Sequence, residues 1–200
     1  MSFNAKKYDK LYTDRTNEIE FLLKNLNKGT VLDIGGGTGI ISEALNKEGF
    51  DCTNLEPQKE MAEVSILRGI DTHHATIEKM EMPIIYDNAI MVFDVFNFLT
   101  DPEKAFENIS KLLKGKLIFR YWNADMKVAG WDFSLKLKRL SRKKWDGNTV
   151  EIDFWFPFWH EKHTMKVYTH GYIKKLLSSK GFKITKKIKG KLNTTIVAEI

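Results

Sequence analysis

Short apolar runs alternate with amphipathic segments along the first 120 residues. The apolar runs have the length of buried strands, and the segments between them have helical spacing. The expected strands are residues 31–34, 50–55, 70–75, 88–92 and 116–122. The expected helices are residues 41–49, 58–68 and 102–114, each followed by a glycine at or near its end. This alternation predicts an α/β fold with a doubly wound, mostly parallel sheet.

The two ends of the chain and residues 124–168 follow other patterns. Near-helical spacing within residues 3–28 predicts an N-terminal helix, and the last 32 residues predict a helix from Thr169 to Lys180 followed by strands at 182–189 and 192–200. Residues 149–156 and 160–168 read as an antiparallel hairpin, whereas part of 123–147 is expected to be helical. We interpret 124–168 as a β-rich insertion into a single domain spanning residues 1–200. It holds six large aromatics that are expected to cover something: Trp145, Phe154, Trp155, Phe156, Phe158 and Trp159.

Composition is ordinary for a soluble globular protein, with 42% hydrophobic and 29% charged residues. No apolar stretch reaches membrane-spanning length and the N-terminus lacks a signal-peptide core, so we expect a cytoplasmic protein without a membrane partner. The single cysteine, Cys52, is expected to be a buried thiol. A net charge of +6 raises the possibility of nucleic-acid binding. The basic residues cluster at 136–144 and 180–191, and solvated faces are the favoured interpretation of both clusters.

The candidate chemistry begins where the first strand meets four glycines in five positions. The spacing Asp33-x-Gly35-x-Gly37-x-Gly39 excludes a P-loop, because no lysine follows Gly39, and it also breaks the dinucleotide fingerprint. A carboxylate at the end of the strand repels a pyrophosphate but attracts an ammonium or sulfonium. The turn therefore predicts a site for a cationic nucleoside.

The run from Val31 to Gly39 resembles the first motif of class I S-adenosylmethionine (SAM)-dependent methyltransferases. The resemblance implies SAM as cofactor and a seven-stranded sheet with an antiparallel last strand. It also implies that Glu56, at the tip of the second strand, accepts the ribose hydroxyls. Thr76 and Ile77 stand where many relatives contact adenine through an acidic residue. The expected cofactor-binding residues are Asp33, Gly35, Gly36, Gly37, Gly39, Glu56, Thr76, Ile77 and Phe93.

Residues 93–99 and 161–182 resemble the small-molecule branch of that family, and the Asn/Asp-Pro-Pro-aromatic motif of amino-group methylases of DNA or protein is absent. The implied function is methyl transfer to an oxygen or nitrogen atom of a small molecule, with residues 124–168 as an acceptor lid. RNA or protein methylation, and a SAM-binding module without catalysis, are the alternatives. On this resemblance Asp94 and Asn97 would orient the acceptor. His163 is the candidate general base, because imidazole titrates near neutrality, against the alternative of a histidine packed on the sheet.

Neither histidine pair offers four metal ligands, so no metal site is predicted. The pairs are His73–His74 and His160–His163. A nucleophile elbow of the form G-x-S-x-G is also missing, which argues against a serine hydrolase. Nothing in the pattern indicates an oligomeric state.

Overall fold

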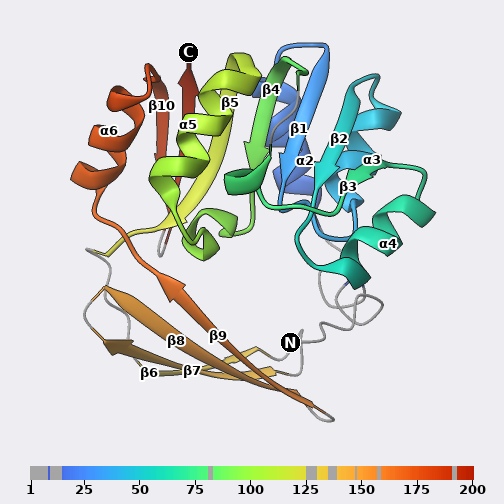
Figure 1. Ribbon diagram of the computed structural model, residues 1–200. Helices are drawn as coiled ribbons and strands as arrows, with labels where there is room; N and C mark the ends of the chain where they lie inside the picture. The colour runs from blue at the N-terminus through green and yellow to red at the C-terminus, as the bar shows by residue number, and fades with distance from the viewer. Residues whose placement is uncertain are drawn as a thin grey trace.

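The computed structural model describes residues 9, 15–80, 83–124, 130–134, 139–146, 148–156, 159–190 and 193–200. It consists of a seven-stranded sheet flanked by helices and a separate four-stranded sheet (Figure 1). No helix in these residues is long and apolar enough to cross a membrane. Tyr8 and Tyr12 lie outside the described residues; from the sequence, their segment could either cover the cofactor and acceptor or pack the N-terminal helix onto the domain.

The large sheet has the order β10-β11-β5-β4-β1-β2-β3. Its strands are β1 (Thr30–Ile34), β2 (Asp51–Leu55), β3 (Asp71–His73), β4 (Tyr86–Met91), β5 (Leu113–Trp122), β10 (Lys183–Lys189) and β11 (Asn193–Glu199). Strands β1 to β5 pair in parallel, and β11 runs antiparallel to both β5 and β10. The predicted doubly wound sheet with an antiparallel last strand is confirmed. Strand β10 forms one edge, and its exposed lysines occupy the position where charge hinders pairing with another chain.

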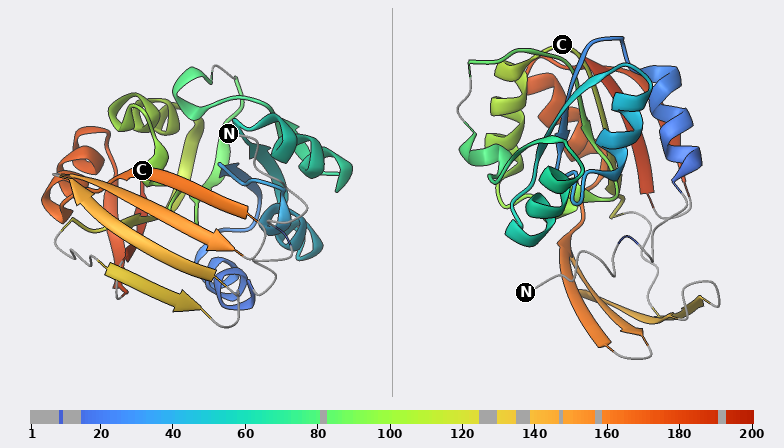
Figure 2. Two further views of the ribbon diagram at one scale, coloured as in Figure 1. Left: turned by 90° about the horizontal axis from the view of Figure 1, so that it is seen from below. Right: turned by 90° about the vertical axis from the view of Figure 1, so that its right-hand side faces the viewer.

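Helices cover both faces of this sheet (Figure 2). They are α2 (Thr16–Asn25), α3 (Ile40–Lys47), α4 (Lys59–Leu67), α5 (Pro102–Leu112) and α6 (His170–Ser179), with 3-10 turns η1 (Ile77–Lys79) and η2 (Val95–Phe98). Helices α2 and α3 pack on one face and α5 and α6 on the other, because alternate strand residues point to opposite sides. Asp101 caps α5 by accepting a hydrogen bond from the Lys104 N–H.

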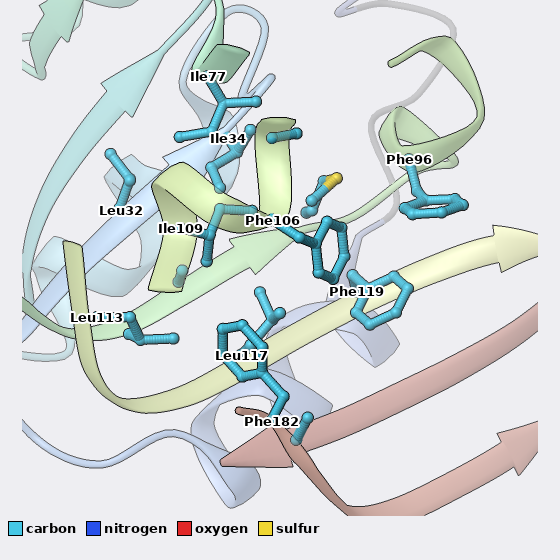
Figure 3. Close-up of a cluster of buried hydrophobic side chains, with 14 of the residues drawn as sticks. Leu32, Ile34, Ile77, Phe96, Phe106, Ile109, Leu113, Leu117, Phe119 and Phe182 are labelled. Atoms are coloured by element: carbon cyan, nitrogen blue, oxygen red, sulfur yellow. The ribbon is translucent and has the colours of Figure 1, made fainter. Parts of the chain in front are cut away.

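Phe96 fastens η2, the segment after β4, to the larger core (Figure 3). Its ring is completely buried and lies 5.7 Å from the Phe106 ring and 5.3 Å from the Phe119 ring. Burying a phenylalanine contributes about 1.5–3 kcal/mol. The residues on either side of Phe96 are therefore held in place at the carboxyl end of β4.

The small sheet has the antiparallel order β6-β7-β8-β9 and lies beneath the carboxyl ends of the parallel strands (Figure 1). Its strands are β6 (Gly130–Ser134), β7 (Arg139–Asp146), β8 (Thr149–Phe156) and β9 (Trp159–Lys166). The hairpin at β8 and β9 was predicted. The partial helix expected in 123–147 was wrong, because 130–134 and 139–146 form the strands β6 and β7, which pair with each other.

One face of the small sheet is turned toward the large one. Val150, Ile152 and Met165 on this inner face are buried and pack with Val167 and with Trp122 at the end of β5. Trp155 lies on the outer face, where its ring stacks on His160 with 5.1 Å between centroids. The covering role expected for the aromatic residues stays a prediction.

Candidate functional site

The glycine turn between β1 and α3 needs glycine for two different reasons. Gly35, Gly37 and Gly39 have positive φ angles of 68°, 60° and 78°, which glycine adopts without strain. At Gly36 a Cβ atom would press against Asn54 Oδ1 and Asp33 Oδ2. The turn can therefore bring its backbone to a ligand at a distance that a side chain would prevent.

Asp33 is fully buried at the end of β1. Ser42 Oγ donates a 2.7 Å hydrogen bond to Asp33 Oδ2, but Oδ1 has no partner among the described residues. Burial raises the pKa of this carboxyl from 3.8 to about 6, and the Ser42 bond opposes the rise. A buried carboxylate oxygen without a partner is costly, so it marks a place for a hydrogen-bond donor or a cation.

Glu56 stands directly after β2 and lies beside the turn. Its two oxygens accept the N–H groups of Gly37 at 2.9 Å and Gln58 at 2.8 Å. Burial raises its pKa, and these two hydrogen bonds oppose the rise. In this conformation Glu56 braces the turn, and a ribose hydroxyl would have to replace or share one of the two bonds.

A small cavity of about 60 Å³ adjoins the turn. It is bordered by Asp33, the glycines, Arg15, Val92, Phe93 and Val95. This is the volume of about two water molecules, whereas small-molecule sites usually measure 300–1,000 Å³. A nucleoside therefore requires this crevice to open.

Arg15 narrows the cavity, and we did not predict it from the sequence. Its guanidinium lies 4.3 Å from the centroid of the Phe93 ring, and it lowers the pKa of Asp33 against the larger effect of burial. The residue precedes α2, 18 positions before Asp33, and belongs to no motif. Only the fold brings it to the turn.

Asp9 holds the N-terminal segment against the turn. Its Oδ1 accepts a 2.6 Å hydrogen bond from Thr38 Oγ1, and its Oδ2 pairs with Arg68, the residue that follows α4. Arg68 also pairs with Glu43 of α3 at 3.0 Å. We call the contacts of Asp9 with Thr38 and Arg68 the latch. Sequence offers no signal for it, because its three residues are far apart in the chain.

The predicted adenine contacts occupy different surroundings. Ile77 is 2% exposed, its side chain belongs to the larger core, and its carbonyl accepts a hydrogen bond from Asn108. Thr76 precedes η1 and is half-buried. Only the backbone of Ile77 remains for a base, and both assignments stay predictions.

Phe93 and Asp94 occupy an unusual backbone conformation after β4. Both are non-glycine residues with positive φ angles, 52° and 67°. Such conformations cost about 1–2 kcal/mol per residue and cluster at functional sites. Asp94 Oδ1 is buried and has no partner in the described part of the chain. Burial raises the Asp94 pKa, and a hydrogen bond with the Trp122 side chain opposes this.

Asn97 joins three elements through its side chain. Nδ2 donates a 2.5 Å hydrogen bond to the carbonyl of Lys166 in β9, and the N–H of Trp122 in β5 donates a 2.8 Å bond to Oδ1. The residue is 1% exposed. These bonds tie the small sheet to the large one. The predicted role in orienting an acceptor stays a prediction, since both ends of the amide already serve the backbone.

His163 lies on the inner face of the small sheet, opposite Ile152. It is half-buried, and its ring centroid is 6.1 Å from that of Phe98. His160 lies on the outer face and bonds to Asp153 at 3.1 Å, so the two histidines do not converge. Within the described residues no three His, Cys, Asp or Glu side chains gather as metal ligands. His163 therefore lies on the face of the small sheet that is turned toward the large one, and its role as a general base stays a prediction.

A larger cavity of about 410 Å³ lies elsewhere, at the junction of β9 and α6. Tyr168 and Tyr172 border it, and their rings stack with 5.0 Å between centroids. It has no carboxylate on its wall and is not bordered by the glycine turn. We therefore place the chemistry at the smaller cavity.

Comparison with known proteins agrees with this geometry. A sequence profile of the methyltransferase-domain family matches residues 5–187. An uncharacterized protein of Methanocaldococcus jannaschii is 32% identical over 128 residues, 60% of each chain. The ubiquinone biosynthesis O-methyltransferase of Nitrosomonas europaea is 25% identical over 138 residues, which are 62% of this chain and 58% of that enzyme. The match thus covers about three-fifths of the length of these curated relatives.

Solved structures share the fold at low sequence identity. SAM-bound CalS10, an amino pentose methyltransferase from Micromonospora echinaspora, has a TM-score of 0.80 at 16% identity, covering 100% of this chain and 98% of that one. A SAM-dependent methyltransferase from Clostridium acetobutylicum has a TM-score of 0.74 at 17% identity, covering 100% and 93%. The chain therefore belongs to the class I, Rossmann-like family of SAM-dependent methyltransferases, as the first motif predicted.

Proposed function

We propose that the protein binds SAM and transfers a methyl group from it to an oxygen or nitrogen atom of a small molecule. The unpartnered, buried Asp33 Oδ1 beside the glycine turn is the observation that carries this proposal. A cationic ligand satisfies that oxygen, whereas a pyrophosphate would be repelled by it. The residues present thus fit SAM better than a dinucleotide.

Of the residues expected to hold SAM, Asp33, Gly35, Gly36, Gly37 and Phe93 border the cavity. Asp33 and the turn backbone would receive its charged end, and Glu56, which braces the turn, would accept the ribose hydroxyls. Thr76 and the Ile77 backbone would adjoin the base, as the resemblance to the family implies. When bound, SAM supplies a methyl group that is already activated on a sulfonium. The protein's task is then to align the acceptor and exclude water.

The small sheet is proposed as the acceptor lid of one domain spanning residues 1–200. Its inner face presents His163 toward the end of β4, and Asn97 connects it there to η2. Exclusion of water from the reacting groups strengthens their electrostatic interactions. As general base, His163 would accept a proton from an acceptor that must lose one.

The outer face of the small sheet supports a small acceptor over a nucleic acid. Its lysines alternate with acids, and Lys162 Nζ pairs with Glu151 at 2.9 Å. Asp153 also lies there, bonded to His160. A nucleic-acid surface would show a continuous basic stripe. The structural neighbour CalS10 is named for an amino pentose, and the relative from Nitrosomonas europaea is named for ubiquinone biosynthesis, which favours the same class.

Calorimetry with SAM and its product S-adenosylhomocysteine (SAH) tests the proposal, with NAD as the comparison ligand. We expect both adenosyl ligands to bind and NAD to bind poorly. Glu56→Ala should weaken SAH binding by about 1–3 kcal/mol, the usual loss of a charge-assisted hydrogen-bonding group. Glu60→Ala, an exposed position on α4, is the matched control. A screen of metabolite fractions for SAH formation then tests catalysis. Failure to bind SAM or SAH would refute the proposal.

A further inference from the structure

Three carboxylates each keep one buried oxygen without a hydrogen-bond partner in the described residues. These oxygens are Asp33 Oδ1, Glu18 Oε1 and Asp94 Oδ1. Such an oxygen is costly unless a ligand supplies a donor. The proposed cofactor accounts for Asp33. Glu18 and Asp94 remain.

Glu18 and Asp94 share one arginine. Glu18, in the first turn of α2, is paired with Arg120 of β5. The same two groups act electrostatically on Asp94, because Arg120 lowers the pKa of Asp94 and Glu18 raises it. A single guanidinium thus faces two carboxylates, which leaves the pair short of one positive charge.

Phe93 connects this pair to the cavity beside the glycine turn. Its ring lies 4.3 Å from the Arg15 guanidinium and 6.0 Å from that of Arg120, and Phe93 itself borders the cavity. Asp94 is the next residue in the chain, and Glu18 is the ion-pair partner of Arg120. A group bound at Asp94 and Glu18 would therefore lie near the proposed cofactor position.

The spare atoms define what can bind there. One nitrogen with two or more N–H groups can donate to both carboxylates, whereas a hydroxyl donates only once and a phosphate or carboxylate has nothing to donate. Among the buried unpartnered atoms of the described residues, the one donor-only atom is Arg68 Nε, which belongs to the latch. The surroundings therefore favour a ligand rich in donors.

We infer that the reacting group of the acceptor is an amine, received as its ammonium form between Asp94 and Glu18. This inference rests on the proposed methyltransferase function and narrows its acceptor to nitrogen. An ammonium must lose one proton before its nitrogen can attack, and for an acceptor held in this way Asp94 Oδ1, in place of His163, accepts that proton. The nitrogen lone pair then forms the N–C bond while the C–S bond breaks and its electron pair stays on sulfur. Asp94 later returns its proton to water.

The other charged groups around Asp94 come from three elements. Glu18 and Arg15 belong to the start of α2, and Arg120 comes from β5. On the small sheet, Lys143 Nζ lies 5.4 Å from the Trp122 ring, and His163 lies beside Phe98. Raising the pH deprotonates Asp94 in the free protein and strengthens its attraction for an ammonium.

The experiment uses the full chain saturated with SAH and pairs of test compounds that differ only in amine against hydroxyl. Cyclohexylamine is compared with cyclohexanol, and benzylamine with benzyl alcohol, by ligand-observed NMR titration at pH 7. We expect each amine to bind at least tenfold more tightly than its alcohol. Asp94→Asn should abolish that preference and keep the backbone, because asparagine tolerates positive φ. Glu18→Gln should reduce the preference, and Glu20→Gln on the exposed side of α2 should leave it unchanged.

The outcomes separate the inference from the function on which it rests. Equal binding of amine and alcohol, binding of neither, or an amine preference that survives in Asp94→Asn overturns the inference. SAH affinity is measured in the same samples, so a protein that binds SAH but shows one of these results keeps its proposed function. Methyl transfer only to metabolites that a cation exchanger does not retain at pH 7 would also overturn the inference. Loss of SAH binding in the wild type would instead refute the function itself.

Discussion

Replacing Asp33 with asparagine tests two effects of its buried charge: the loss of folding stability and the proposed gain in SAM affinity. The variant keeps the size of the side chain, and its carbonyl can still accept the bond from Ser42 Oγ. A shift of the Asp33 pKa from 3.8 to about 6 corresponds to about 3 kcal/mol at about 1.4 kcal/mol per unit. We therefore expect the ligand-free variant to be more stable than the wild type at pH 7, by up to about that amount.

The sign follows from proton binding. The folded protein keeps the Asp33 proton up to about pH 6, whereas the unfolded chain releases it near 3.8. Between these values the folded state holds more protons, so this residue's contribution to stability is present at low pH and is lost as pH rises through 6. Urea unfolding of both proteins from pH 4.5 to 7.5 isolates it, because other titrating groups cancel in the difference.

Binding of SAM should favour the charged form of Asp33, whereas the ligand-free fold favours the neutral form. A cation beside Asp33 stabilises its carboxylate, so SAM should bind more tightly as pH rises through 6 and should release a proton. Loss of one hydrogen bond to a charged group, about 1.5–3 kcal/mol, predicts SAM binding weakened by roughly 10- to 150-fold in Asp33→Asn at pH 7.5. Calorimetry in two buffers of different ionisation enthalpy measures affinity and proton release together. Asp51→Asn, at the exposed start of β2, serves as the control.

Equal SAM affinity in the variant and the wild type, with no pH dependence in either, would refute this reasoning. The unpartnered oxygen would then be a feature of the empty fold and not part of a cation site. If ligand-free Asp33→Asn is less stable than the wild type at pH 7, the predicted gain in stability is refuted. Contacts that asparagine cannot make would then outweigh the cost of burying the charge.

Three further substitutions test the surroundings of the site. Asp9→Ala removes both contacts of the latch, and stopped-flow fluorescence should show SAH binding and leaving several-fold faster; unchanged rates would contradict a gating role. Asn97→Ala leaves two backbone groups unpaired, so urea unfolding should show that the free energy of unfolding falls by about 2–4 kcal/mol. Proteolysis of 124–168 should also be faster, and a fall below about 1 kcal/mol would contradict the role of Asn97 in joining the two sheets. Gly36→Ala should abolish SAH binding in calorimetry because its Cβ meets two buried oxygens. Gly171→Ala in α6 should bind normally, because its Cβ meets only Thr169 Oγ1 at an ordinary contact distance of 3.9 Å.

The sequence pattern could predict those helices and strands whose degree of burial is uniform along their length. Strands β1 and β4 are largely buried, so Val31–Leu32 and the run from Ala89 to Val92 are apolar, and the carboxylates near the ends of β1 and β2 follow from counting residues. Strand β7 was harder because its residues Arg139–Asp146 are mostly charged, and this hides the alternation of a half-exposed strand.

The charged groups that narrow the crevice could not be predicted in the same way. Glu18 and Arg120 are 102 positions apart, and Arg15 meets Phe93 across a comparable gap. Each of these residues is unremarkable in its own segment. Their meaning arises only when the carboxyl ends of β4 and β5 meet the start of α2, which the order of strands in the sheet determines.

The strained pair after β4 has a geometric reason. Phe93 borders the cofactor cavity and Asp94 faces the proposed acceptor position, and consecutive Cα atoms are about 3.8 Å apart. Reacting atoms must come within about 3–3.5 Å for efficient transfer. A dipeptide fixed between β4 and the buried Phe96 can therefore set both ligands at reaction distance from one rigid element. The positive φ angles would turn the two side chains toward different ligands. Because this backbone conformation costs free energy, the stretch is stabilised by the buried Phe96 close behind it.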